Sequence, residues 1–289
     1  MATPAQWLEG ARPRTLPAAL APVAAGTGAA GAVDAVCPSR ALLALLVAVA
    51  LQVGVNYAND YSDGVRGTDA ERVGPLRLVG SGAASPAAVK GAALVSFAVA
   101  GVAGLVLSAV TSWWLVLIGA ACLAAAWFYT GGRSPYGYRG LGEVSVFLFF
   151  GLVATAGTTY VQAGEVTVAA VLAGVGCGAL ACAILVANNL RDRALDVGAG
   201  KRTLAVRLGD SRTRVLFVAL IGTAYAVVLA LGVDQRWVLL VLLTVPLAAQ
   251  PAVLTLRGAA GLDLVPVLKG TGLVLLVYGV ALGITLALG

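Results

Sequence analysis

The sequence has no histidine and very few charged side chains. Its 289 residues include 19 Lys and Arg and 13 Asp and Glu, so charged residues make up 11% of the chain, against about 25% in soluble proteins. A chain this poor in charge cannot cover itself with a polar surface. This excludes a soluble enzyme, a disordered protein and a nucleic-acid binder, despite the net charge of +6. Without histidine there is no imidazole ligand or imidazole general base, so any metal must be held by oxygen.

Cysteine is also scarce and carries no motif. None of the cysteines belongs to a C-x-x-C pair, and all lie in or beside apolar runs. This placement is typical of small apolar packing residues rather than of a redox or metal motif. The four are Cys37, Cys122, Cys177 and Cys182.

Long apolar runs make up most of the rest of the chain. Apolar residues are 60% of the sequence, and a helix that spans a bilayer needs about 20 of them in succession. The runs are continuously apolar rather than alternating, which favours helices over a membrane sheet. We therefore expect an all-α integral membrane protein, one domain over 1–289, with nine transmembrane helices. The runs are 15–35, 40–60, 88–110, 112–130, 141–162, 166–188, 213–232, 236–256 and 264–288.

Basic residues are divided unevenly between the two sides of such a bundle. With the N-terminus in the cytoplasm, 17 of the 19 Lys and Arg fall in or beside inside segments, and only Arg40 and Arg236 fall outside. The positive-inside rule therefore predicts a multi-pass protein of the cell membrane with a cytoplasmic N-terminus and an outside C-terminus. The two long polar segments, 61–87 and 189–212, are expected as cytoplasmic loops, so the active site is expected to face the cytoplasm.

Two acidic segments share a pattern at the ends of the second and sixth runs. In each, an Asp follows an Asn by four residues: Asn59 to Asp63, and Asn188 to Asp192, with Asp196 four residues later. A step of four turns a helix about 40° past a full circle, so the second set lines one helix face. Both sets end even-numbered runs, which predicts that they lie on the same, cytoplasmic side.

Two facing carboxylate clusters at membrane depth would repel each other and lose solvation. A divalent cation removes both costs, and a purely oxygen-donor site favours Mg²⁺, with Mn²⁺ or Ca²⁺ as alternatives. The other interpretation is solvated loops with surface ion pairs. Basic side chains interleave with the acids and can bind anionic oxygen, which indicates a metal–diphosphate site. These side chains are Arg66, Arg72, Arg77, Arg191, Lys201 and Arg202.

The two segments resemble the paired Asp-rich motifs of the UbiA superfamily of intramembrane prenyltransferases, and the resemblance covers essentially the whole chain. It implies Mg²⁺-dependent transfer of a polyprenyl group from polyprenyl diphosphate to an aromatic acceptor. Four stretches resemble the branch that acts on 1,4-dihydroxy-2-naphthoate. In that branch the ring loses its carboxyl group, which gives demethylmenaquinol or demethylmenaquinone in menaquinone biosynthesis. The stretches are RPRTLPAALAPV, NDYSDGVRGTDAERVGPLRLVGSG, FYTGGRSPYGYRGLGE and NNLRDRALDVGAGKRTLAVRLG.

The resemblance also implies roles for the acids and amides of the two motifs. The first motif departs from the family's spacing, because Gly67 stands where the next acid belongs. Asp69 follows it, and Asp60 competes for the same role. The implied metal contacts, direct or through bound water, are Asn59, Asp60, Asp63, Asn188, Asp192 and Asp196. The implied catalytic residues are Asp63, Asp69, Asp192 and Asp196.

A Tyr-x-x-x-Lys element of the family contacts the diphosphate. Its match here is Tyr129 to Arg133, in which Arg keeps the charge of Lys with a different geometry. The alternative for Arg133 is a positive-inside anchor. The diphosphate-binding set implied by the resemblance and by the basic residues of the motifs is Arg66, Arg72, Arg77, Tyr129, Arg133, Lys201 and Arg202.

The acceptor site is expected to contain a cation for the naphthoate carboxylate. The candidates are Arg139 and Lys269, with Arg12 or Arg14 as alternatives, and Lys269 can equally be a snorkelling anchor at the membrane surface. Residues after the fourth run are expected either to frame the ring or to belong to the loop. They are Tyr136, Tyr138 and Glu143.

Two other functions fit part of the sequence. Another member of the superfamily would keep the mechanism and change the acceptor, for example to 4-hydroxybenzoate. A secondary transporter would also carry repeated acids within a membrane bundle. The acids cluster at the ends of apolar runs rather than at mid-membrane, which argues against a transporter.

Overall fold

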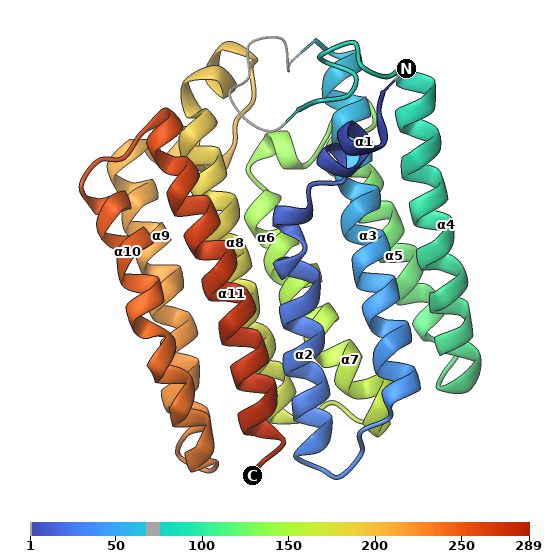
Figure 1. Cartoon of the computed structure of the whole chain (residues 1–289), viewed down its shortest axis with the longest axis vertical. Helices are drawn as coiled ribbons and strands as arrows, with labels where there is room; N and C mark the ends of the chain where they lie inside the picture. Colours follow the sequence, from blue (N-terminus) through green and yellow to red (C-terminus); the bar gives the residue numbers. More distant parts are fainter. Residues whose placement is uncertain (1, 68–75) are drawn as a thin grey trace.

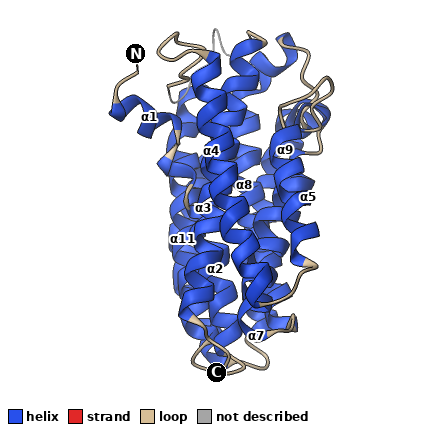
Figure 2. Ribbon diagram, turned by 90° about the vertical axis from the view of Figure 1, so that its right-hand side faces the viewer, coloured by secondary structure: helices blue, strands red, loops and turns tan. Residues whose placement is uncertain are grey.

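The computed structural model describes residues 2–67 and 76–289, and every regular element within these ranges is a helix. The helices run along the long axis of an elongated bundle (Figures 1 and 2). The N-terminus lies at one end of the bundle and the C-terminus at the other (Figure 1). The predicted site residues Asp69 and Arg72 lie outside the described residues.

Each predicted apolar run coincides with a helical segment. The first half of the chain contains α1 (Pro4–Gly10), η1 (Pro13–Thr15), α2 (Pro17–Gly31), α3 (Pro38–Val65), α4 (Pro86–Val110) and α5 (Leu115–Phe128). Next comes η2 (Gly137–Arg139). It is followed by one continuous helical segment, the η3–α7 rod, which consists of α6 (Gly142–Val146), η3 (Phe147–Val153) and α7 (Ala154–Ala163). The last elements are α8 (Val168–Gly198), α9 (Leu204–Leu231), η4 (Arg236–Thr244), α10 (Val245–Leu256), η5 (Gly261–Asp263) and α11 (Leu264–Leu286).

Seven helical segments in the described part of the chain are long and apolar enough to span a membrane. Two predicted spans correspond to shorter helices, α2 with 15 residues and α5 with 14. Large apolar side chains face outward along the bundle, as in Leu117, which is 74% exposed, and Leu243, which is 77% exposed. Surfaces of this kind are stable against lipid rather than water, so the chain is a multi-pass membrane protein.

Both acidic motifs lie inside helices rather than in loops. α3 continues to Val65 and α8 continues to Gly198, so the predicted loop 189–212 is mostly helical. Only residues 199–203 join α8 to α9, and Gly200 adopts the left-handed φ of +69° that ends the first helix. Helical structure through the motifs fixes the spacing of their side chains, which a loop would not do.

The bundle divides into two packed halves. One core lies among α2, α8, α9, α10 and α11, and a smaller one lies among α1, α3, α4 and α5. Glycine lets α2 and α11 touch along their backbones, since a Cβ on Gly28 would lie 2.0 Å from the carbonyl oxygen of Gly283. Because α3 belongs to one half and α8 to the other, the two acidic motifs face each other across the division.

The N-terminal segment is tied to α3. α1 is inclined to the long axis and lies at the side of the bundle, near the end that carries the N-terminus (Figure 2). Tyr57 donates a hydrogen bond of 2.8 Å to the carbonyl oxygen of Trp7, and Asn56 donates one of 2.9 Å to the carbonyl of Ala11. These contacts bring the residues that follow α1, 12–15, to the cavity that lies between the two halves.

Candidate active site

A cavity of about 1160 Å³ lies between the two halves of the bundle, and its polarity changes along its length. On α3 its wall runs from apolar Ala44 and Val47 to polar Asn59 and Asp63. The far part is apolar and is formed mainly by α4, α5 and the η3–α7 rod. Its lining there includes Gly101, Gly104, Leu105, Val116, Ile118, Gly119, Phe149, Val153 and Gly157.

Asp63 is the centre of the polar end on the α3 side. It is 3% exposed and accepts a hydrogen bond from the phenol of Tyr138. Nη2 of Arg77 lies 3.6 Å from its Oδ2, so a cation approaches the same carboxylate. One turn earlier, Asn59 Oδ1 accepts a hydrogen bond of 2.7 Å from the hydroxyl of Thr130. The first motif is thus held in place by side chains that follow α5.

The second motif lines the opposite wall from α8. Asn188, Asp192 and Asp196 all face the cavity, as their four-residue spacing predicts. Arg191 forms a two-bond ion pair with Asp192, with N–O distances of 2.7 and 2.8 Å, and donates a further bond of 2.9 Å to Asn188. The carboxylates on this wall therefore have a cation beside them, like Asp63 on the other wall.

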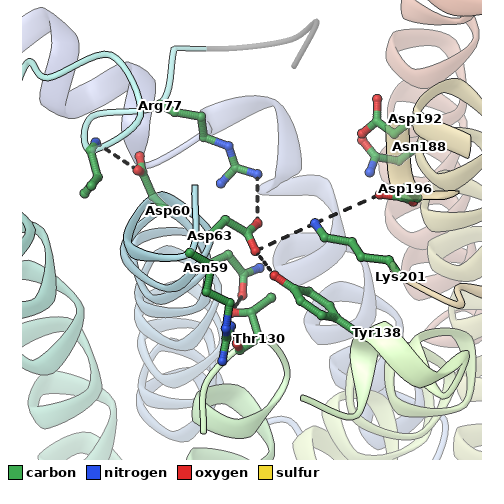
Figure 3. A network of polar contacts seen from close by, with 12 residues as sticks. Asn59, Asp60, Asp63, Arg77, Thr130, Tyr138, Asn188, Asp192, Asp196 and Lys201 are labelled. Carbon is green, nitrogen blue, oxygen red and sulfur yellow. Dashed lines mark hydrogen bonds and ion pairs between the residues drawn. The ribbon is translucent and has the colours of Figure 1, made fainter. Parts of the chain in front are cut away.

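Lys201 lies between the two motifs (Figure 3). Its Nζ is 3.8 Å from Oδ1 of Asp63 and 4.0 Å from Oδ1 of Asp196. Within the described ranges, no three Asp, Glu or Cys side chains are close enough together to hold a metal by themselves. The acids instead form two groups of hard oxygen donors with a cation between them. Such a site fits Mg²⁺, which uses one or two carboxylates and takes its other ligands from phosphate and water.

Asp60 does not join this cluster. Its carboxylate points away from the cavity and accepts backbone hydrogen bonds of 2.7 Å from Leu78 and 3.1 Å from Val79. The side chain is 1% exposed and fixes the segment after the undescribed residues onto α3 (Figure 3). The structure places this carboxylate on backbone amides rather than in the cavity, because helical geometry turns Asp60 by about 100° from Asn59.

Four predicted cations also lie outside the cavity wall. Arg66 donates to the carbonyl oxygens of Thr130 and Gly132, and thereby joins the end of α3 to the segment after α5. The other three, predicted to bind diphosphate or acceptor, are exposed and line a second, smaller pocket on the outside. They are Arg133, Arg139 and Arg202.

Other predicted residues do reach the cavity wall. Tyr129 and Lys269 line it, together with Arg12 before η1 and Arg14 within η1. Tyr136 also lines it, and its hydroxyl donates to the carbonyl of Ala125 at 2.8 Å. Burial raises the pKa of Tyr136 more than its hydrogen bond with Ser145 lowers it, so this phenol stays neutral at physiological pH.

Glu143 is buried away from the cavity. Its Oε1 accepts a hydrogen bond of 3.0 Å from Asn189, which belongs to α8. It therefore joins the start of α6 to α8 and does not line the cavity. Sequence reasoning missed Thr130 and Arg207, because nothing in their spacing distinguishes them from other loop and helix residues. Only the folded chain places Thr130 against Asn59 and Arg207 in the second pocket.

A long apolar cavity that ends in carboxylates and cations has the shape and charge that suit an intramembrane enzyme with a long-chain anionic substrate. Residues 19–263 match the UbiA prenyltransferase family, and the chain belongs to that family. It is 53% identical over 289 residues to 1,4-dihydroxy-2-naphthoate octaprenyltransferase of Mycobacterium tuberculosis, covering 100% of this chain and 99% of that one. It is 38% identical to the protein of the same name from Escherichia coli, covering 92% and 89%.

Solved structures share the fold at low sequence identity. A UbiA homolog from Aeropyrum pernix K1 in its apo form has a TM-score of 0.71 and 16% identity, covering 91% of this chain and 96% of that one. A UbiA homolog from Archaeoglobus fulgidus bound to GPP and Mg²⁺ has a TM-score of 0.63 and 17% identity, covering 96% and 99%. The all-helical UbiA fold expected from the sequence is confirmed by these likenesses.

Proposed function

We propose that this protein transfers a polyprenyl group from polyprenyl diphosphate to 1,4-dihydroxy-2-naphthoate with loss of the acceptor's carboxyl group. The product is demethylmenaquinol, or demethylmenaquinone after oxidation, in menaquinone biosynthesis. The observation that carries the proposal is the convergence of Asp63 on α3 with Asp192 and Asp196 on α8 at the polar end of a long apolar cavity. The full-length relatives named for the naphthoate acceptor support it over 4-hydroxybenzoate.

The oxygen donors at the polar end suit Mg²⁺, which is supported by the archaeal homolog solved with GPP and Mg²⁺. We assign the metal contacts, direct or through water, to Asn59, Asp63, Asn188, Asp192 and Asp196. When bound, Mg²⁺ neutralises the diphosphate and stabilises the charge that builds on it as it leaves. Mn²⁺ has the same ligand preference and is the alternative ion.

The cations of the chain act on the same leaving group. Arg77 and Lys201 line the cavity next to Asp63, where an anionic oxygen would lie within reach of both. As the carbon–oxygen bond of the prenyl diphosphate breaks, its electron pair moves onto the diphosphate. Cations that are already in position stabilise this charge without reorganising. Tyr129 also lines the cavity and completes the assigned diphosphate contacts.

The apolar part of the cavity holds the prenyl chain and excludes water. The allylic carbon becomes cation-like as the diphosphate leaves, and water in the site would capture it. The electron-rich ring attacks this carbon, and a carbon–carbon bond forms. The bond to the ring carboxylate then breaks, its electron pair returns to the ring, and carbon dioxide leaves. We assign the naphthoate carboxylate to Lys269, with Arg12 and Arg14 at the same side of the cavity.

We also propose that the chain crosses the cell membrane nine times, with its N-terminus and active site facing the cytoplasm. The placement of 17 of the 19 Lys and Arg supports this orientation. α2 and α5, at 15 and 14 residues, would be the two short crossings.

A fusion of alkaline phosphatase to the C-terminus tests this orientation. The phosphatase folds only outside the cytoplasm, so the fusion should be active. An inactive fusion on a protein that is otherwise competent would overturn the orientation.

A transfer assay on the detergent-purified protein tests the reaction. The protein receives polyprenyl diphosphate, Mg²⁺ and 1,4-dihydroxy-2-naphthoate, with 4-hydroxybenzoate in a parallel tube, and mass spectrometry identifies the product. We expect the prenylated, decarboxylated product from naphthoate alone, and none when a chelator removes the metal. Product from 4-hydroxybenzoate alone would keep the mechanism and overturn the acceptor. No product from either, in folded protein, would overturn the reaction.

A further inference from the structure

Four arginines converge on a pocket that lies outside the catalytic cavity. The pocket has a volume of about 410 Å³, which lies within the range of small-ligand sites. No acidic side chain is among its described lining residues, so its charge is uniformly positive. The arginines are Arg133, Arg139, Arg202 and Arg207.

The pocket is built by contacts between two segments that are distant in sequence. The guanidinium of Arg207 on α9 donates a hydrogen bond of 2.6 Å to the carbonyl of Arg139 and one of 3.2 Å to the carbonyl of Arg202. The amide of Arg202 donates one of 2.8 Å to the carbonyl of Tyr138. One arginine therefore fixes η2 against the α8–α9 link, and the fold holds the other three around the pocket.

The other three guanidinium groups have no hydrogen-bond or ion-pair partner within the described ranges. Cations held close together repel one another unless an anion lies between them. The positive-inside rule accounts for arginine on this face of the membrane. The rule does not account for four arginines around one pocket, whose two segments are joined by hydrogen bonds from the Arg207 side chain.

Tyr138 lines both the pocket and the catalytic cavity. No other described residue lines both. On the cavity side its hydroxyl donates to Asp63, and Nζ of Lys201 lies 4.5 Å from the centre of its ring. On the outer side the same residue faces the arginines. Tyr138 therefore joins the pocket to the catalytic cavity, with its backbone carbonyl bonded to the amide of Arg202 and its hydroxyl bonded to Asp63.

We propose that this pocket is a binding site for a phosphate-bearing anion, distinct from the catalytic cavity. Guanidinium forms paired, charge-assisted hydrogen bonds with phosphate oxygens, and Arg133, Arg139 and Arg202 offer three such groups. The phosphate can come from inorganic diphosphate in solution or from the headgroup of an anionic phospholipid. Neither source depends on which aromatic acceptor the enzyme uses.

The experiment compares the wild-type protein with two double variants. Arg139→Gln with Arg202→Gln removes two charges from the pocket, and Arg212→Gln with Arg257→Gln removes two exposed charges elsewhere. Each protein is placed in nanodiscs of phosphatidylcholine with a chelator, and inorganic diphosphate is titrated by calorimetry. Arg139 and Arg202 line the outer pocket and not the catalytic cavity, so the difference in heat between the wild-type protein and the Arg139→Gln, Arg202→Gln variant reports the arginine pocket. In a second arm, nanodiscs also contain phosphatidylglycerol, and native mass spectrometry counts the retained lipid.

We expect only the Arg139→Gln, Arg202→Gln variant to lose affinity, by about tenfold or more, for either diphosphate or phosphatidylglycerol. A loss in the titration identifies free diphosphate as the ligand, and a loss of retained phosphatidylglycerol identifies a lipid headgroup. Equal diphosphate affinity and equal lipid retention in the three proteins would overturn the site. The arginines would then be explained by the positive-inside rule alone. If the double variant does not fold, Arg133→Gln replaces it, since the Arg133 side chain is exposed and makes no hydrogen bond or ion pair within the described ranges.

Discussion

The ammonium nitrogen of Lys201 lies 3.8 Å from Oδ1 of Asp63, so a side chain from the α8–α9 link reaches the acidic motif of α3. The same nitrogen lies 4.0 Å from Asp196. In the absence of a metal, Lys201 thus neutralises carboxylates from both walls of the cavity. A divalent ion and this ammonium group would compete for the same oxygens.

This competition predicts an unusual response to Lys201→Gln. Less Mg²⁺ should be needed for half-maximal activity, because the competing cation is gone. At the same time kcat should fall about tenfold or more, because the diphosphate loses a stabilising charge as it leaves. Titration of Mg²⁺ in the transfer assay measures both effects, with Lys201→Arg as the charge-preserving control. A higher Mg²⁺ requirement in Lys201→Gln would contradict the competition.

Replacing a single acid in either motif should stop transfer without unfolding the protein. Asp63→Asn and Asp192→Asn each remove one of the proposed metal contacts, from opposite walls, so kcat/KM should fall about 100-fold or more in each. Helix α3 or α8 loses no backbone partner, so the thermal midpoint should change little. Near-normal turnover by either purified variant would remove that residue from the metal site.

Asp60 should behave in the opposite way, although it is only three residues from Asp63. Its carboxylate holds the amides of Leu78 and Val79 in a buried position. Asn presents one acceptor and one donor to the two amides, so Asp60→Asn should lower the free energy of unfolding by about 1–3 kcal/mol. The Mg²⁺ requirement of the remaining folded enzyme should match the wild type. A changed requirement with unchanged stability would return Asp60 to the metal site.

Gly28 sets the approach of α2 to α11, and the effect of a single methyl group there can be measured. A Cβ on Gly28 would meet the carbonyl of Gly283 at 2.0 Å, whereas a Cβ on Gly222 of α9 meets nothing within 4 Å. Gly28→Ala should therefore lower the free energy of unfolding by about 1–3 kcal/mol, and Gly222→Ala should not. Denaturant unfolding in detergent compares the two, and equal stability would mean that the helices separate freely.

The sequence by itself determined the class of the protein and the kinds of ligand atom that are open to a metal. A shortage of charge and a series of long apolar runs leave a membrane bundle of helices as the stable arrangement. The four-residue spacing of Asn188, Asp192 and Asp196 places them on one face of any helix that they share. The absence of histidine limits a metal to oxygen donors, whatever the fold.

Only the tertiary structure decided which polar residues face the cavity. Asp60 and Asp63 look equivalent in sequence, yet helical geometry directs one to backbone amides and the other to the cavity. Arg202 and Lys201 are adjacent, but one faces the outer pocket and the other lies between the acidic motifs. Charge and spacing establish that such residues are near the site, and the packing of α3 against α4 and of α8 against α9 sets their directions. Contacts between distant segments, such as Thr130 with Asn59, have no local signal because they exist only once the two halves of the bundle are joined.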